Sequence, residues 1–179
     1  MKILHIKNKA GFTLIETIVA IFLFSIIIAC LFSVLATARS SWTSSSSQVN
    51  VQQEARRGLS AMVRELRQAN LSGITGVPAD GADYNSITFQ IPVSITVAGA
   101  TWSSNIQYSL GGLNGMQLLK TQDDSQRVLA NNISAVTFNR TVLSPDTINI
   151  SVTTQKNTFP GFSIIQSSIT LNSEVKVRN

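Results

Sequence analysis

The stretch KNKAGFTLIETIVAIFLF, Lys7 to Phe24, decides the fold, because it opens a long apolar run close to the N-terminus. From Thr17 to Ala38 the chain has 22 consecutive residues without a charge. At about 1.5 Å per helical residue, a helix of this length reaches about 33 Å, enough for a hydrocarbon core of about 30 Å. We therefore predict one membrane-spanning helix over residues 12–38.

Lysines flank the beginning of this helix and predict its orientation. Lys2, Lys7 and Lys9 precede the apolar run, and no acidic residue accompanies them. Short basic flanks stay on the cytoplasmic side of a membrane. We expect residues 1–11 to form a cytoplasmic leader and the C-terminal part of the chain to cross the membrane.

A cleavable secretory signal is the alternative interpretation of the same run. Ala36, Thr37 and Ala38 form a small-x-small pattern that suits a signal peptidase. Cleavage there would release a soluble periplasmic binding module that begins at Arg39. The apolar run is longer than the roughly 7–15 residues of a signal peptide, which favours the membrane anchor.

Glu16 is an acidic residue inside the predicted span, where a charge usually has a partner and a function. Cleavage after Gly11 would give Phe12 a new α-amino group, a cation four residues before Glu16. Gly11 suits cleavage because it has no side chain and weakens a helix locally. The alternative is that Glu16 reaches the cytoplasmic headgroups without a specific partner.

The segment KAGFTLIE, residues 9–16, followed by the apolar helix, resembles the class III prepilin leader of type IV pilins and type II secretion pseudopilins. The resemblance implies that a prepilin peptidase cuts between Gly11 and Phe12 and that the Phe12 amine is then methylated. It also implies that Glu16 neutralises the amino terminus of a neighbouring subunit during assembly. The implied partners are the peptidase, other pilin or pseudopilin subunits and an inner-membrane assembly platform.

The same resemblance implies an α+β pilin-like fold, in which a long N-terminal helix, transmembrane in its first half, packs on an antiparallel β-sheet domain. It places the protein in the bacterial inner membrane as a single-pass chain. The leader would be cytoplasmic, and the C-terminal domain periplasmic and carried into a periplasmic or surface filament.

Residues 39–70 are predicted to continue the helix with an amphipathic pattern. The serine-rich residues 38–48 predict a softer joint or a solvated linker. The segment QQEARRGLSAMVRELRQA, residues 52–69, resembles the corresponding helix of J-type minor pseudopilins. Its Arg and Glu residues are expected to be solvated, with a contact to another subunit as the alternative. Apolar residues at three- and four-residue steps predict the buried stripe: Val51, Ala55, Leu59, Met62, Leu66 and Ala69.

Residues 71–179 alternate apolar and polar positions and predict a β-rich extracytoplasmic domain. GGLNG, residues 111–115, predicts a hairpin turn between two of its strands. The predicted strands are residues 86–97, 106–110, 116–121, 133–139, 148–154 and 163–177.

Several classes of function are disfavoured by composition. The single histidine, His5, lies in the leader, and the single cysteine, Cys30, lies in the apolar run, so we expect neither an enzyme nor a cofactor. Asp123 and Asp124 are expected to be solvated, with a Ca²⁺ site as the lesser alternative. Residues 71–179 hold six basic and six acidic residues, which argues against direct nucleic-acid binding.

The favoured hypothesis is a minor pseudopilin of a type II secretion system, a filament subunit that helps to initiate or cap the pseudopilus for protein export. A minor pilin of a type IV pilus, serving adhesion, motility or DNA uptake, is the alternative within the same resemblance.

Overall fold

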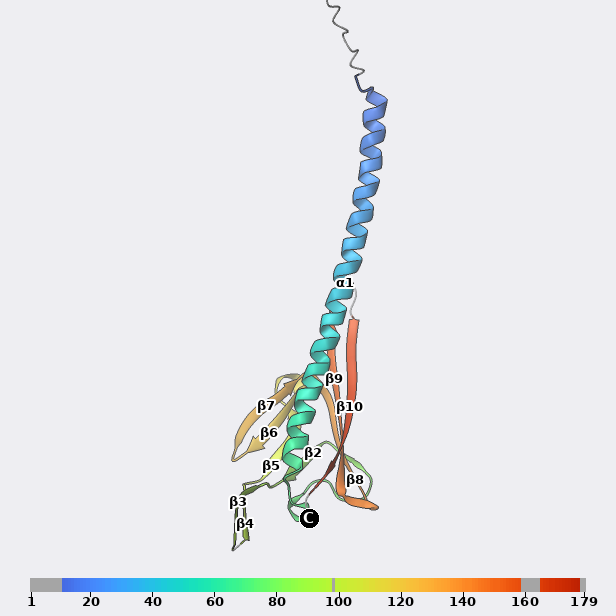
Figure 1. Ribbon diagram of the computed structural model, residues 1–179. Helices are drawn as coiled ribbons and strands as arrows, with labels where there is room; N and C mark the ends of the chain where they lie inside the picture. Colours follow the sequence, from blue (N-terminus) through green and yellow to red (C-terminus); the bar gives the residue numbers. More distant parts are fainter. Residues whose placement is uncertain (1–10, 98, 159–164, 178–179) are drawn as a thin grey trace, which may run out of the picture. The chain divides into compact units, whose positions relative to one another are not determined.

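A computed structural model of the chain describes residues 11–97, 99–158 and 165–177 (Figure 1). The chain divides into two compact units, Met1–Trp42 and Thr43–Asn179, and one helix, α1 (Leu14–Leu66), contributes residues to both. The predicted cytoplasmic leader lies outside the described residues except for Gly11. The three lysines that predict its orientation therefore also lie outside them.

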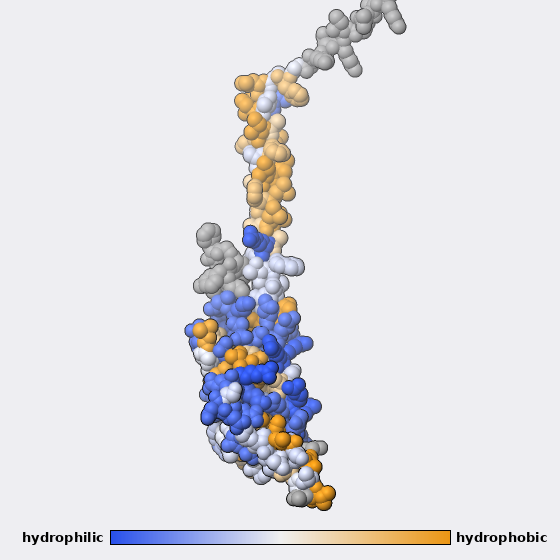
Figure 2. Space-filling view, turned by 90° about the vertical axis from the view of Figure 1, so that its left-hand side faces the viewer, coloured by the Kyte–Doolittle hydropathy of each residue, from blue (hydrophilic) through white to orange (hydrophobic). Residues whose placement is uncertain are grey.

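The first unit consists, in its described part, mainly of the N-terminal portion of α1. Its large apolar side chains, from Phe12 to Leu35, are exposed. Figure 2 shows them as a run of orange atoms along the face turned to the viewer. A helix that is apolar all round suits a lipid environment rather than one face of a soluble core. Among the described residues, α1 is the one helix long and apolar enough to cross a membrane.

The serine-rich residues 38–48 are helical throughout. These residues are mostly exposed, as the predicted solvated linker would be, but they belong to α1 and do not form a separate linker. Serine lowers helix stability by only a few tenths of a kcal/mol per residue relative to alanine, which is too little to interrupt a helix that continues on both sides. The helix ends at Leu66 rather than at the predicted Asn70, and Asn70 instead caps a short 3₁₀ turn, η1 (Leu71–Gly73).

The second unit packs the C-terminal portion of α1 against two antiparallel four-stranded sheets (Figure 1). One sheet has the order β2-β5-β6-β7 and the other β1-β8-β9-β10, while β3 and β4 form a separate two-stranded sheet. Strand β8 contacts β2, β5 and β6, so the two larger sheets meet along it. The strands are β1 (Asp83–Tyr84), β2 (Ser86–Phe89), β3 (Pro92–Thr96), β4 (Gly99–Trp102), β5 (Ile106–Gly111), β6 (Gln117–Gln122), β7 (Ser125–Asn131), β8 (Ile133–Thr141), β9 (Ser144–Thr158) and β10 (Ile165–Lys176). The predicted helix on an antiparallel β domain is confirmed.

Most predicted strands are present with shifted ends, but one predicted strand is divided and three strands were not predicted. The single strand predicted over residues 86–97 is wrong, because the chain leaves β2 after Phe89 and starts β3 at Pro92. Strands β1, β4 and β7 were not predicted. The hairpin turn predicted for residues 111–115 is confirmed, and it contains a second 3₁₀ turn, η2 (Leu113–Gly115). The first two residues of the strand predicted over 163–177 lie outside the described residues.

The core of the second unit joins one stripe of α1 to the inward side chains of both larger sheets. Five of the six predicted stripe residues are fully buried, and the sixth, Leu59, is partly buried. Helix and sheet approach each other closely at Gly58, which the predicted pattern did not include. A Cβ at Gly58 would lie 3.0 Å from Leu118 Cδ2 and 3.2 Å from Ala130 Cβ.

We expect Gly58→Val to destabilise the second unit by about 1–3 kcal/mol, because added methyl groups must push α1 away from β6 and β7. The matched control is Ser60→Val, which places the same side chain on the exposed face of the same helix. Its expected effect is within about 0.5 kcal/mol. Thermal unfolding of both full-length variants in detergent checks the difference, and equal midpoints would contradict the close approach.

Candidate functional site

The candidate site is the segment in which the chain enters α1. Gly11, Phe12 and Thr13 are described but not helical, and α1 begins at Leu14. Phe12 is 85% exposed, and no atom of the described part of the chain lies within 4 Å of the position that a Cβ would take at Gly11. The Gly11–Phe12 peptide bond therefore lies in open, non-helical backbone, which is the kind of segment that proteases cut.

Thr13 caps the N-terminus of α1. Its hydroxyl oxygen accepts a hydrogen bond from the Glu16 backbone N–H at 3.3 Å, and its carbonyl oxygen accepts one from the Thr17 N–H at 3.2 Å. A threonine followed three residues later by a glutamate is a common N-terminal capping pattern. Glu16 thus lies in the first turn, where the partial positive charge of the helix end favours a carboxylate. The sequence contains this capping pattern, but it was not used in the prediction.

Glu16 is the one charged side chain in the described apolar part of α1 up to Ala38. Its side chain is exposed, and none of the ion pairs among the described residues involves it. In the hydrocarbon of a membrane, only the partial positive charge of the helix end would compensate the charge of the Glu16 carboxylate. Placing the carboxylate there costs a few kcal/mol of free energy. A cation brought beside Glu16 by another molecule would remove this cost.

The prokaryotic N-terminal methylation motif matches residues 6–30 of the chain. This match covers Gly11, Phe12 and Glu16 together with the beginning of the apolar helix. The chain therefore carries the N-terminal motif of pilin-like proteins. The motif is the class III prepilin leader. It supports processing of the chain by a prepilin peptidase and its assembly with other pilin subunits. The predicted membership of the pilin and pseudopilin family is confirmed at this level.

No curated protein and no solved structure matches the pilin-like chain. The motif match ends at residue 30, before the second unit begins. The long apolar helix and the antiparallel sheets nevertheless give an α+β pilin-like architecture. Pilins and pseudopilins are structural rather than catalytic proteins.

Other residues considered for chemistry lie apart from this segment. Asp123 and Asp124 form the two-residue turn between β6 and β7, and both have a positive φ, 50° and 59°. Positive φ at both central residues is the type I′ hairpin geometry, which accounts for two adjacent aspartates. Among the described residues, no group of three His, Cys, Asp or Glu side chains is placed to hold a metal ion. His5 lies outside the described residues.

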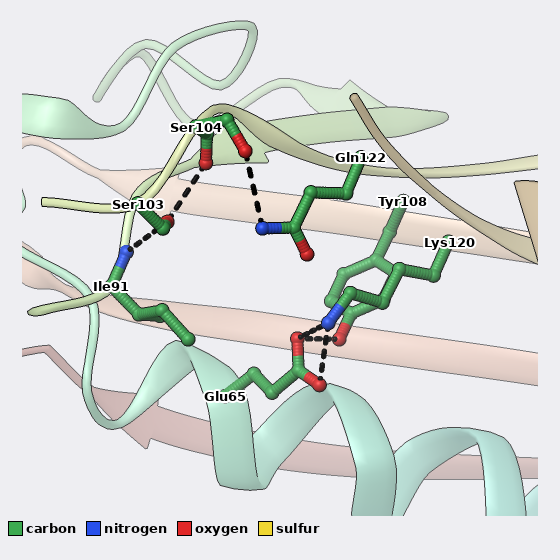
Figure 3. Close-up of polar contacts among 7 residues, drawn as sticks. All are labelled: Glu65, Ile91, Ser103, Ser104, Tyr108, Lys120 and Gln122. Atoms are coloured by element: carbon green, nitrogen blue, oxygen red, sulfur yellow. Dashed lines mark hydrogen bonds and ion pairs between the residues drawn. The ribbon is translucent and has the colours of Figure 1, made fainter. Parts of the chain in front are cut away.

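Sequence reasoning missed one ionic cluster of the pilin-like chain, which lies between α1 and the sheet (Figure 3). Both carboxylate oxygens of Glu65 accept hydrogen bonds from Lys120 Nζ, at 2.8 and 2.9 Å, and Oε2 also accepts one from the Tyr108 hydroxyl at 2.8 Å. The predicted solvated role of Glu65 is therefore wrong. Lys120 and Tyr108 are 55 and 43 residues away in the sequence, so no local pattern indicated the contact.

Tyr108→Phe is expected to cost about 1.5–3 kcal/mol of stability, since it removes a hydrogen bond to a charged group in the core. Burial, followed by the Glu65 hydrogen bond, raises the pKa of Tyr108 above its ordinary value of 10.0. The folded state thus keeps a proton that the unfolded chain releases, and the stabilisation is lost as pH rises above about 10.

Denaturant unfolding at pH 8 and pH 11 measures both effects, and the part of the pH dependence that comes from Tyr108 should disappear in Tyr108→Phe. Tyr84→Phe is the matched control, because the Tyr84 hydroxyl donates to Asp80 in a solvent-exposed hydrogen bond. Equal losses in the two variants would argue against the buried cluster.

Proposed function

We propose that the chain is a minor pseudopilin of a type II secretion system. In this proposal a prepilin peptidase cuts between Gly11 and Phe12, the Phe12 amine is methylated, and α1 enters the core of a filament. The second unit is displayed in the periplasm, and the subunit helps to initiate or cap the pseudopilus. The inner-membrane assembly platform and other pseudopilin subunits are its partners.

The methylation motif at the start of an exposed apolar helix is the observation that supports this proposal. In a helical bundle, Glu16 of one subunit meets the amino terminus of a neighbour, and the two charges compensate each other in a medium of low dielectric constant. Glu16 and the Phe12 amine lie within one turn or so of the same helix end. A small axial shift between neighbouring helices is therefore enough to bring them together.

The choice of a pseudopilin over a minor type IV pilin rests on residues 52–69, which resemble the helix of J-type minor pseudopilins. The methylation motif is common to both classes. Deletion of the gene with complementation separates the two functions. For a pseudopilin, folded exported proteins accumulate in the periplasm while surface pili and pilus-dependent motility persist. Normal export with loss of pili would assign the chain to the type IV pilus instead.

A further inference from the structure

The β3–β4 hairpin has an apolar face that is mostly exposed, since among its strand residues only Pro92 is half-buried. Its register pairs Pro92 with Trp102, Ile95 with Ala100 and Ser94 with Thr101. Directly opposed residues share a face, so one face is apolar and the other carries hydroxyl groups. Ile95 is 72% exposed, and Val93, the extra residue of the bulge between Pro92 and Ser94, is 69% exposed. The apolar face comprises Pro92, Ile95, Ala100 and Trp102.

Figure 2 shows apolar side chains gathered at the lower end of the second unit, where Figure 1 places β3 and β4. Contiguous exposed apolar patches on soluble domains mark interaction sites, whereas scattered apolar residues do not. An isolated two-stranded hairpin is also marginally stable in water. Both the exposed apolar face and the low stability of an isolated hairpin therefore favour the binding of a partner.

The base of the hairpin is held in place by hydrogen bonds (Figure 3). The Ile91 carbonyl accepts from the Ser103 N–H at 2.8 Å, and the Ile91 N–H donates to the Ser103 hydroxyl at 3.2 Å. Next to it, Gln122 Nε2 donates to the Ser104 hydroxyl at 3.2 Å, which ties the base to β6. The apolar face thus projects from an anchored base.

The chemistry of the partner follows from the absence of charge. Residues 84–119 contain no Asp, Glu, Lys, Arg or His, so strands β2, β3, β4 and β5 carry no charged side chain. A nucleic acid or a strongly charged protein surface would bury its charges there without compensation. The matching surface is therefore uncharged and apolar.

Two further observations identify a protein subunit rather than lipid. Strands β3 and β4 pair only with each other in the described chain, so both outer edges carry unpaired N–H and C=O groups. Such edges are not tolerated in hydrocarbon, but they pair readily with another strand. The apolar face has four residues, far fewer than the roughly 20–30 per side of a standard interface, so it suits a neighbour that is already held close.

We propose that the apolar face of the β3–β4 hairpin docks on an uncharged surface of a neighbouring pilin-like subunit in the same filament. This inference rests on the proposed function, because membrane anchoring and filament assembly hold the neighbour at the high effective concentration that so small a face requires. The apolar face makes the contact, and an open strand edge of the hairpin extends it by backbone pairing.

The test uses the full-length chain in its own cells, with the photoreactive residue p-benzoylphenylalanine in place of Ile95. The matched control places it at Thr96, which is the next residue and belongs to the hydroxyl face. We expect light to yield an adduct from position 95 with another copy or with a second protein that carries its own N-terminal methylation motif. Position 96 should give at least about tenfold less adduct. Equal adducts at both positions, an adduct only with lipid or with unrelated proteins, or no adduct would overturn the inference.

A second measurement does not depend on the photoreactive residue. Ile95→Ser combined with Trp102→Ser should lower recovery of the chain with its neighbouring subunits by at least about tenfold. Ser94→Ala combined with Thr96→Ala should leave recovery unchanged. Thermal unfolding of both variants verifies that the core is intact. If Glu16→Val has no effect on assembly, the proposed function fails. If Glu16→Val prevents assembly but both hairpin variants assemble normally, only the hairpin inference fails.

Discussion

Glu16→Val is expected to leave the chain inserted in the membrane and cleaved, yet to lower its incorporation into filaments at least about tenfold. Valine is tolerated by lipid better than glutamate is, so insertion is not impaired. In the filament, however, the amino terminus of a neighbour loses its carboxylate partner. Leaving one member of a buried ion pair uncompensated costs about 3–5 kcal/mol, and about 1.4 kcal/mol corresponds to a factor of ten.

Glu16→Asp is the matched control, because it keeps the charge in the first turn of α1 and shortens the side chain by one methylene group. It should retain most of the incorporation. The measurement is the amount of chain recovered with sheared or cross-linked filaments, relative to the amount in the membrane. Incorporation of Glu16→Val at the level of the unaltered chain would show that charge pairing does not drive assembly.

Gly11→Glu is expected to abolish removal of the leader. Among the described residues, nothing lies within 4 Å of a Cβ at Gly11, so the substitution meets no steric obstacle from that part of the chain. We expect the substitution to act on recognition by the peptidase, because a bulky charged side chain at position 11 would lie directly before the bond to be cut. The uncleaved chain keeps three leader lysines and lacks the Phe12 amine, so it should accumulate in the membrane and stay out of filaments.

Gly11→Ala distinguishes two effects on the rate of cleavage, the size of the side chain at position 11 and the conformational freedom of its backbone. Slower but detectable cleavage is expected, since the methyl group is small and the described φ of Gly11 does not require glycine. Mass spectrometry of the membrane-bound chain distinguishes the cleaved and uncleaved forms. Complete cleavage of Gly11→Glu would contradict the assignment of a prepilin peptidase.

The sequence was sufficient to predict the apolar helix, the β-rich domain and the leader, because each depends on local pattern. Thr17 to Ala38 has no charge, and the alternating apolar residues of β8 and β9 match the period of a strand with one buried face. The methylation motif is likewise contiguous. Features that depend on residues adjacent in the sequence could therefore be predicted without a structure.

Features that depend on distant contacts were not accessible. Strand β7, with the sequence SQRVLAN, has four exposed residues at its start and no clear alternation, and it is defined by its pairing with β6. Gly58 is buried because Leu118 and Ala130 approach it, and a glycine within an amphipathic helix gives no apolar signal. Glu65 looks like any solvated helical glutamate until the sheet brings Lys120 and Tyr108 to it.

The mass of the N-terminal peptide of the chain purified from its own cells tests the central claim most directly. A chain that begins with Phe12 and carries one additional methyl group on its amine is the predicted result. It would establish that cleavage supplies a cation at the helix end that carries Glu16. A functional chain that keeps the leader, or one that begins at Arg39, would contradict the account.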